Sequence, residues 1–534
     1  MKAMPLQRCN SSSPLLEGPL SLWGARLGLV AVISIGAYLR FFALRDVPSW
    51  VSDEGSNMDI AYSLAQGKLA YFAIGHSSFI NGHPHLFYLL LAGIYRLVDF
   101  DLVWARGLTA LYGVVTIVLL YVVVRQMFNR TIALLAALIL AIYPHAVIYN
   151  RMAFTYNQLQ PLYIMAYYLL WRYLKDRDRK WLIYVSLCVT AALVTDWAAT
   201  SLLAILLIVV MVKRPKQLVW VLPLSLSASV VWGLVMWNAS GQPFLDDLAF
   251  TLSRVGGSPF EQIARIVLLY PAVLEWDVWL FAGGLGLFLI PERLQRVLAL
   301  ALFYGSLLLT VRAGAASGIA SYLLIPLFPF VALGLAIFIS HIVPLLIREF
   351  EGDLDAVLKG RSILQICPQG WRMVRLIVVG VAVFVIALSP LVAMLAEGLF
   401  LDYKLSTAHL AGTLADPTEA ENVANFVNAN ASADDIVLAS PSILWLFRAQ
   451  VADFQQAVAI TGHRTQHYPA GIPKDRFLFD CSLENADFVV LDPLWRGWAS
   501  QMMPEVAQMV TEVEAWPLAL KAGDFEVYRN PAKQ

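Results

Sequence analysis

An acidic pair, Asp53 and Glu54, lies in a polar stretch shortly after the first apolar run of the chain. A carboxylate can act as a general base that takes a proton from an attacking hydroxyl group, and a second carboxylate can orient a neighbouring group or bind a metal ion. The alternative is that both side chains are solvated loop residues, as most acidic residues in loops are. The pair is therefore a candidate catalytic site.

Further polar residues are expected on the same side of the membrane as this pair. The candidates are His83, Arg106, His145, Asn150, Arg151, Asp196, Arg254, Arg265, Arg312 and Tyr322. Asp196 lies at a tight turn between two short apolar runs, where a carboxylate is costly unless it faces water or a partner. Taken singly, each residue could instead be a helix-end side chain that extends to the membrane interface. Their common side favours a shared site.

The composition indicates that membrane helices position these residues. The chain has 534 residues, of which 59% are hydrophobic and 14% are charged, whereas soluble domains carry about 25% charged residues. The 38 basic residues balance the 38 acidic ones, so the net charge gives no sign of a nucleic-acid partner, and none is expected. We interpret the chain as an α-helical polytopic membrane protein.

Cysteine and histidine spacing gives little sign of a disulfide or a metal. Of the four cysteines, Cys481 alone falls in the part expected outside the membrane, so no intramolecular disulfide is expected. The sequence has no Cys-x-x-Cys pair and no His/Cys cluster. We therefore expect no metal site and no cofactor.

Twelve apolar runs are candidates for membrane spans, since a span needs roughly 20 apolar residues. They are 27–44, 84–98, 104–124, 131–149, 157–174, 181–196, 198–213, 217–238, 278–291, 297–311, 320–340 and 374–396. Basic clusters mark the cytoplasmic side, and all of them fall on one side only if the short run 84–98 does not cross. We read this run as an interfacial helix. Eleven spans remain, with the N-terminus inside and the C-terminus outside.

This topology predicts three parts, namely a cytoplasmic segment 1–26, a transmembrane domain 27–396 and an extracytoplasmic domain 397–534. Two outer loops, about 45–103 and 239–277, belong to the transmembrane domain. The composition changes near residue 397, and the tail reads as a small α/β domain. We expect a helix over 416–430, strands over 435–439 and 488–491, and a closing edge strand over 525–528. The tail has no triad-like arrangement, so we expect it to shape the approach of an acceptor rather than to catalyse.

The order of these motifs resembles GT-C membrane glycosyltransferases of the protein mannosyltransferase and aminoarabinose transferase type. The resemblance covers about 30–340 and rests on the combination of segments rather than on any one of them. The matching segments are Leu39-Arg40-Phe41, the acidic pair Asp53-Glu54, the stretch 83–90 that begins His83-Pro84-His85, the stretch 105–130 that begins Ala105-Arg106, the stretch 143–153 that ends Arg151-Met152-Ala153, and the stretch 321–329 that begins Ser321-Tyr322.

The resemblance implies transfer of a sugar from a polyprenyl-phosphate carrier to a lipid, glycan or protein acceptor on the outer face of the membrane. Asp53 corresponds to the family's base, and Glu54 would orient a neighbour. The family's basic residue before the proline corresponds to His83, which could contact the phosphate. Arg106 and Arg151 match family arginines, one of which we expect near the phosphate. Displacement by this base would invert the anomeric centre, and a monophosphate carrier does not require a metal.

The chain departs from the family pattern at three places. His85 replaces the second proline, Ser321 replaces a basic residue before Tyr322, with Arg312 as a possible substitute, and Gly55-Ser56 stands where some relatives have a basic residue. These departures concern the phosphate contacts more than the base.

Two other functions are compatible with the same residues. One is a transporter or flippase for a lipid-linked sugar, although such proteins often contain inverted repeats and we detect none. The other is a non-catalytic assembly protein with a transferase-like fold. Convergence of Asp53, His83 and Arg151 on one cavity would favour the enzyme.

Overall fold

The computed structural model describes residues 22–67, 84–253, 278–314, 321–341 and 413–533, together with 381, 392, 396, 399 and 400. His83, Arg254, Arg265 and nearly all of the expected last span, 374–396, lie outside these residues.

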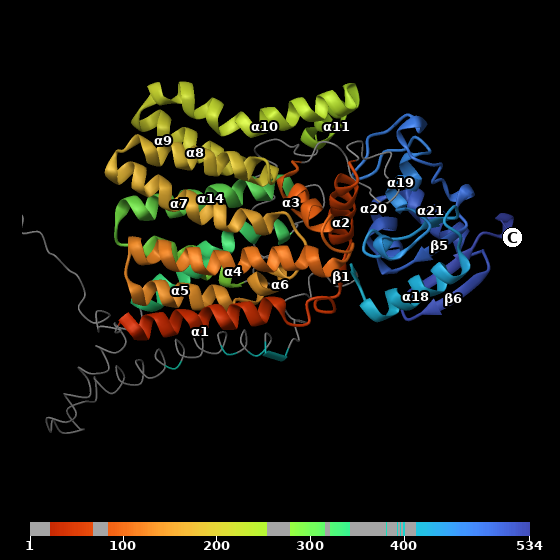
Figure 1. Cartoon of the computed structure of the whole chain (residues 1–534), viewed down its shortest axis with the longest axis horizontal. Coiled ribbons are helices and arrows are strands. Elements are labelled where there is room, and N and C mark those ends of the chain that lie inside the picture. Colours follow the sequence, from red (N-terminus) through yellow and green to blue (C-terminus); the bar gives the residue numbers. More distant parts are fainter. Residues whose placement is uncertain are drawn as a thin grey trace, which may run out of the picture.

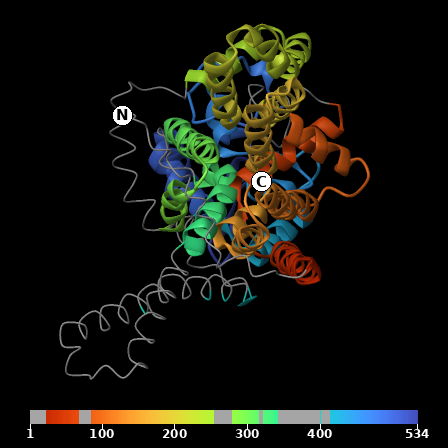
Figure 2. The same ribbon diagram turned by 90° about the vertical axis from the view of Figure 1, so that its left-hand side faces the viewer.

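The N-terminal part of the described chain is a bundle of helices that run side by side (Figure 1). Figure 2 looks along this bundle, with the C-terminal domain behind it. Its helices are α1 (Leu22–Phe41), α4 (Leu102–Met127), α5 (Arg130–Ile142), α6 (Pro144–Asn150), α7 (Tyr156–Asp176), α8 (Arg179–Leu193), α9 (Thr200–Lys213), α10 (Leu218–Ser240), α13 (Val278–Gly286), α14 (Arg293–Gly314) and a last helix that continues from the 3-10 helix η5 (Ser321–Leu327).

Polar side chains begin several of these helices. Asp101 accepts a hydrogen bond from the Val103 amide at the start of α4, and Asn129 accepts one from Ile132 at the start of α5. Such caps satisfy backbone N–H groups that have no partner within the helix. The break between α5 and α6 has a local cause, because Tyr143 precedes a proline and is held in an extended conformation.

Four helices among the described residues are long and apolar enough to cross a membrane: Trp23–Phe41, Leu102–Met127, Pro215–Ser240 and Tyr322–His341. The helices α5 and α6 together would make a fifth, bent by 60° at the break. The protein is therefore a helical membrane protein. The count of eleven spans stays a prediction.

The helix α3 (Leu86–Tyr95) occupies the run 84–98 and has only 10 residues. At 1.5 Å per residue it extends about 15 Å, about half the thickness of the hydrocarbon layer. Its length fits the interfacial position expected for this run.

A cysteine at Asp99, in the exposed turn after α3, is expected to react with a membrane-impermeant thiol reagent added outside the cell. The background would be a chain in which the four native cysteines are replaced. A cysteine at Lys216, which lies between α9 and α10, serves as the control and should react only after permeabilisation. The same accessibility at both positions, or the reverse pattern, would rule out the proposed topology.

The C-terminal part is an α/β domain with a five-stranded sheet in the order β4-β3-β5-β7-β6. Its strands are β3 (Ile436–Leu438), β4 (Gln450–Ala452), β5 (Phe488–Leu491), β6 (Leu518–Ala522) and β7 (Phe525–Arg529), and its longer helices are α18 (Pro417–Asn430) and α21 (Pro504–Val513). The strand β3 pairs in parallel with β4 and β5, whereas β7 pairs antiparallel with β5 and β6. The expected helix over 416–430 and strands over 435–439 and 488–491 are confirmed.

The expectation that 525–528 forms the edge of this sheet is wrong. The strand β7 lies between β5 and β6, and β6 is the edge. The sequence Leu-Ala-Leu-Lys-Ala of β6 is mostly exposed and has no β-branched or aromatic residue, so it lacks the signals that mark a strand.

The helix α2 (Ser52–Ala65) carries the acidic pair and lies across the end of the bundle, between the bundle and the C-terminal domain (Figure 1). Just before it, the short strand β1 (Trp50–Val51) pairs antiparallel with β2 (Leu414–Ala415). The Trp50 ring also packs on Trp445, with 5.0 Å between ring centroids. The acidic pair is thus attached to both parts of the protein.

Gly55 allows α2 to approach the C-terminal domain, because a Cβ at this position would lie 1.7 Å from the carbonyl oxygen of Pro441. We expect Gly55→Ala to lower the free energy of unfolding by about 1–3 kcal/mol, the usual cost of overpacking, and to raise the rate of proteolysis in the tail. Thermal unfolding and limited proteolysis would measure these effects.

The matched control is Gly107→Ala in α4, where an added Cβ meets no described atom within 4 Å outside the helix's own backbone. This change should be neutral or stabilise by up to about 1 kcal/mol, because alanine favours helix. Equal behaviour of the two variants would contradict the proposed contact between Gly55 and Pro441.

Candidate active site

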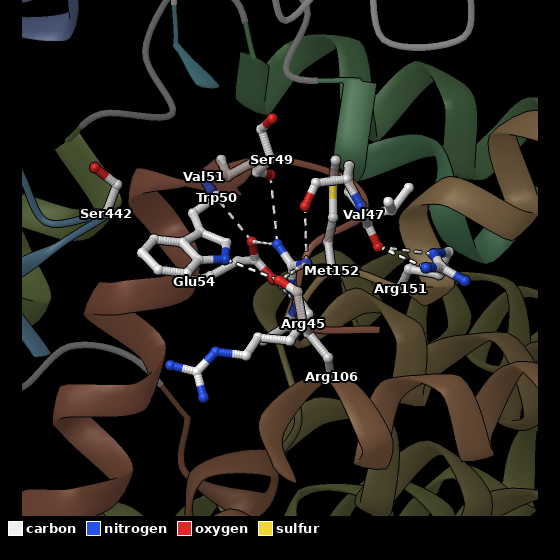
Figure 3. Close-up of polar contacts among 12 residues, drawn as sticks. Arg45, Val47, Ser49, Trp50, Val51, Glu54, Arg106, Arg151, Met152 and Ser442 are labelled. Carbon is white, nitrogen blue, oxygen red and sulfur yellow. Dashed lines mark hydrogen bonds and ion pairs between the residues drawn. The ribbon is translucent and has the colours of Figure 1, made fainter. Parts of the chain in front are cut away.

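Arg106 on α4 is fully buried and holds the loop that leads to the acidic pair (Figure 3). Its Nε and Nη2 atoms donate to Oε1 and Oε2 of Glu54 at 2.9 and 2.7 Å. Its remaining hydrogens are donated to the carbonyl oxygens of Leu44, Arg45, Pro48 and Ser49. A two-pronged arginine–carboxylate pair of this kind is stronger and more specific in geometry than a hydrogen bond between neutral groups.

The Glu54 carboxylate accepts two further hydrogen bonds, from the amides of Ala153 at 2.8 Å and Val51 at 3.2 Å. It is 1% exposed. These contacts join the start of α2 to α4 and to the segment that follows α6. With four donors around a buried carboxylate, Glu54 is placed to hold its neighbours in position rather than to meet a substrate.

Arg151, at the end of α6, is also fully buried and holds the end of α1. Its guanidinium group donates to the carbonyl oxygens of Leu39, Phe42, Ala43 and Val47 at 2.7–3.0 Å. Ala43 has φ 47°, in the left-handed region that is unfavourable for residues other than glycine. The contact with Arg151 therefore stabilises a strained turn.

Arg40 completes this group of buried arginines. It donates to Asn150 Oδ1 at 2.8 Å and to the carbonyl oxygens of Leu140 and Ala141 at 2.9 Å. We call Arg40, Arg106 and Arg151 the arginine cluster. The hydrogen bonds described for all three join distant parts of the backbone, and a phosphate contact of Arg106 or Arg151 stays a prediction.

Asp53 has different surroundings from Glu54, although the two residues are adjacent. Its side chain is only partly buried, and the Ser52 hydroxyl lies at 3.5 Å, the limit of a hydrogen bond. Burial raises the pKa of the Tyr156 hydroxyl, at the start of α7, and the nearby Asp196, Tyr322, Asp53 and Tyr88 raise this pKa further. Asp53 therefore belongs to a cluster of acids and tyrosines, which we call the acid–tyrosine cluster.

Aromatic stacking and a hydrogen bond hold Tyr156, Tyr322 and Asp196 of this cluster in place. The rings of Tyr156 and Tyr322 stack with centroids 5.4 Å apart, and Phe154 stacks on the Tyr322 ring at 5.1 Å. Asp196 accepts a hydrogen bond from the Thr155 hydroxyl at 3.0 Å. Segments from α2, α3, α7, the turn before α9 and η5 thus meet at one end of the bundle.

Tyr88 connects the cluster to α2, because its hydroxyl donates to Asn57 Oδ1 at 2.9 Å and Asn57 donates to the Ala153 carbonyl at 2.8 Å. Sequence reasoning did not single out Tyr88 or Tyr156. Tyr88 is part of the recognised stretch 83–90, and Tyr156 comes five residues after Arg151. Their positions inside the stretch 83–90 and just after the stretch 143–153 were the signal in the sequence that could have identified both tyrosines.

His85, which stands where the family has a proline, has a defined protonation state. The indole N–H of Trp232 on α10 donates to His85 Nδ1 at 3.0 Å, so the proton of the neutral ring is on Nε2. Burial lowers the pKa of His85 to about 3. The ring is therefore neutral near pH 7, with its hydrogen on Nε2.

For Arg312 and Ser321, the structure gives the position in a helix but not the surroundings of the side chain. Arg312 lies on the last turn of α14, and Ser321 begins η5. Within the described ranges, no group of three or more His, Cys, Asp or Glu side chains could hold a metal ion.

Residues 82–237 match a family model described as dolichyl-phosphate-mannose-protein mannosyltransferase. Among solved structures, ArnT from Cupriavidus metallidurans bound to undecaprenyl phosphate superposes with a TM-score of 0.60 at 14% identity, covering 96% of this chain and 99% of that chain. An oligosaccharyltransferase from Archaeoglobus fulgidus, tethered to an acceptor peptide, superposes with a TM-score of 0.52 at 12% identity, covering 92% of this chain and 71% of that chain. A search of curated protein sequences found no match.

Proposed function

We propose that this membrane protein, a GT-C superfamily member similar to the mannosyltransferases and to ArnT, transfers a sugar from a polyprenyl-phosphate carrier to an acceptor hydroxyl on the outer face of the membrane. The observation that supports the proposal is the difference between the surroundings of Asp53 and those of Glu54. Glu54 is occupied by Arg106, whereas Asp53 is partly exposed beside the acid–tyrosine cluster.

The proposed reaction is one displacement at the anomeric carbon. Asp53 takes the proton of the acceptor hydroxyl, and the acceptor oxygen forms a bond to that carbon. The bond between the carbon and the phosphate oxygen breaks, and its electron pair stays on the polyprenyl phosphate. Because the acceptor attacks from the face opposite to the phosphate, the product has the inverted configuration.

The leaving phosphate needs hydrogen-bond donors that strengthen their contacts as its charge develops. We assign this role to His83 and Arg312, as the family resemblance suggests. Asp196 and Tyr322 would contact the sugar from the acid–tyrosine cluster. Arg106 and Arg151 would act as positioning residues, since their hydrogen bonds set the path of the loop before α2.

An amphiphilic donor also needs an apolar path from the bilayer, because its prenyl chain cannot leave the hydrocarbon. The outer faces of the bundle helices are apolar and exposed, as at Leu89 and Leu90 of α3 and Val231 and Leu234 of α10. These residues lie on the same two helices as His85 and Trp232. A prenyl chain lying there would have its phosphate close to the candidate site.

The decisive experiment is a transfer assay with the purified protein in lipid vesicles and a panel of polyprenyl-phosphate sugars. Release of polyprenyl phosphate, together with a glycosylated acceptor of inverted configuration, is the expected result. Loss of both in Asp53→Asn would tie transfer to the proposed base. Movement of the donor across the bilayer without any transfer would instead identify a transporter.

A further inference from the structure

A second polar feature lies at the end of the bundle remote from the C-terminal domain, which is the end that Figure 2 faces. It is a cavity of about 400 Å³ lined by Tyr173, Leu174, Arg177, Lys213, Arg214 and Leu294. These residues come from the last turn of α7, the end of α9 and the start of α14. From Tyr156 to Tyr173, α7 extends about 25 Å at 1.5 Å per residue, so the cavity is separate from the candidate active site.

The cavity is strongly positive, because Arg177, Lys213 and Arg214 all line it. None of these three side chains forms an ion pair with another described residue. The two carboxylates that flank Arg177 in the sequence are already paired, Asp176 with Arg172 and Asp178 with Lys180. Basic residues are common at cytoplasmic helix ends, but here three of them converge on one hollow.

The backbone at Arg177 supports a specific site. Arg177 is the C-cap of α7 and has φ 58°, a left-handed conformation that glycine or asparagine usually occupies at this position. Strained backbone of this kind tends to persist where a side chain has a task. Tyr173, which is buried and also lines the cavity, donates its hydroxyl hydrogen to Gln217 Oε1 at 2.9 Å.

Apolar surface adjoins the cavity. Ile208, Met211 and Val212 on α9 and Val219 on α10 are 54–81% exposed. In a membrane protein these side chains face lipid. A ligand for this place should therefore have an anionic head that fits among three cations and apolar chains that lie along the neighbouring helices.

We propose that this cavity binds the phosphate group of an anionic phospholipid of the facing leaflet, with the acyl chains along the exposed faces of α9 and α10. A free phosphate ion would meet the three charges but would leave the adjoining apolar surface unused. The site is independent of the sugar transfer proposed above and would act as a lipid anchor for the ends of α7, α9 and α14.

The test compares phosphatidylglycerol with phosphatidylcholine of the same acyl chains, using native mass spectrometry and the thermal unfolding midpoint of the full-length protein in detergent. Wild-type protein should retain phosphatidylglycerol and unfold at a higher temperature in its presence. Lys213→Gln/Arg214→Gln should weaken phosphatidylglycerol binding by about 30-fold, since each basic residue near a lipid surface contributes about fivefold in affinity.

Arg125→Gln/Arg130→Gln is the matched control. It removes two charges from the same end of the bundle, where α14 contacts the end of α4 through a hydrogen bond from Gln295 to the Met127 carbonyl. This variant should bind phosphatidylglycerol as wild type does. If both variants lost phosphatidylglycerol binding equally, the binding would depend on the general surface charge and not on this cavity. If inorganic phosphate raised the unfolding temperature as much as phosphatidylglycerol does, the cavity would be a site for free anions. Either result overturns the proposal.

Discussion

Asp53→Asn is expected to lower the turnover of sugar transfer by about 10²- to 10⁴-fold, the usual contribution of a positioned general base. Asparagine preserves the shape of the side chain but cannot accept the proton of the acceptor hydroxyl. Asp53 is partly exposed, so the thermal unfolding midpoint and the binding of the donor should stay close to those of wild type.

Glu54→Gln is the matched control, because it makes the same chemical change one residue later. It leaves the buried Arg106 without a charged partner, so its main effect should be a smaller amount of folded protein. Turnover per folded molecule should fall far less than in Asp53→Asn. Near-normal turnover in Asp53→Asn together with abolished turnover in fully folded Glu54→Gln would move the base by one residue.

Arg106→Met is expected to lower the free energy of unfolding by about 3–5 kcal/mol, the usual cost of removing one partner of a buried ion pair. The change leaves the charge of Glu54 buried and removes the donor to the carbonyl oxygens of residues 44, 45, 48 and 49. Thermal or denaturant unfolding in detergent would measure the loss.

Arg45→Met provides the comparison, because Arg45 also pairs with carboxylates, Asp101 and Glu421, but its side chain is 38% exposed. This change should cost less than about 1 kcal/mol, as is typical of exposed ion pairs. The double variant Glu54→Gln/Arg106→Met should lose less stability than the sum of the two single variants. If Arg106→Met were fully stable but bound the donor poorly, Arg106 would be a phosphate ligand after all.

Composition and hydropathy predicted the helical membrane bundle, and local patterns predicted α18, β3 and β5 of the C-terminal domain. The edge strand was missed, because the exposed residues of β6 resemble a loop. The pairing of Trp50 with Ala415 could not be predicted either, since nothing local to either residue specifies a partner so far along the chain.

The candidate site was predictable only in part. Residue types indicated an acidic pair, but its division into a buried member and an accessible one depends on tertiary contacts, because neighbouring residues on a helix point about 100° apart. Likewise, a sequence does not distinguish an arginine that binds a phosphate from one that holds backbone carbonyls. Which of these roles Arg106 and Arg151 have depends on neighbours that come from distant parts of the chain.

The pairing of β1 with β2 has a consequence for how the protein is made. Arg106 and Arg151 follow Trp50 by about a hundred residues or fewer, so the arginine contacts to the loop become available early in synthesis. Ala415, the partner of Trp50, is 365 residues further along, which corresponds to roughly 20–70 s of translation at about 5–20 residues per second. The loop before the acidic pair can thus be held by its arginines well before the strand pairing that ties it to the C-terminal domain forms.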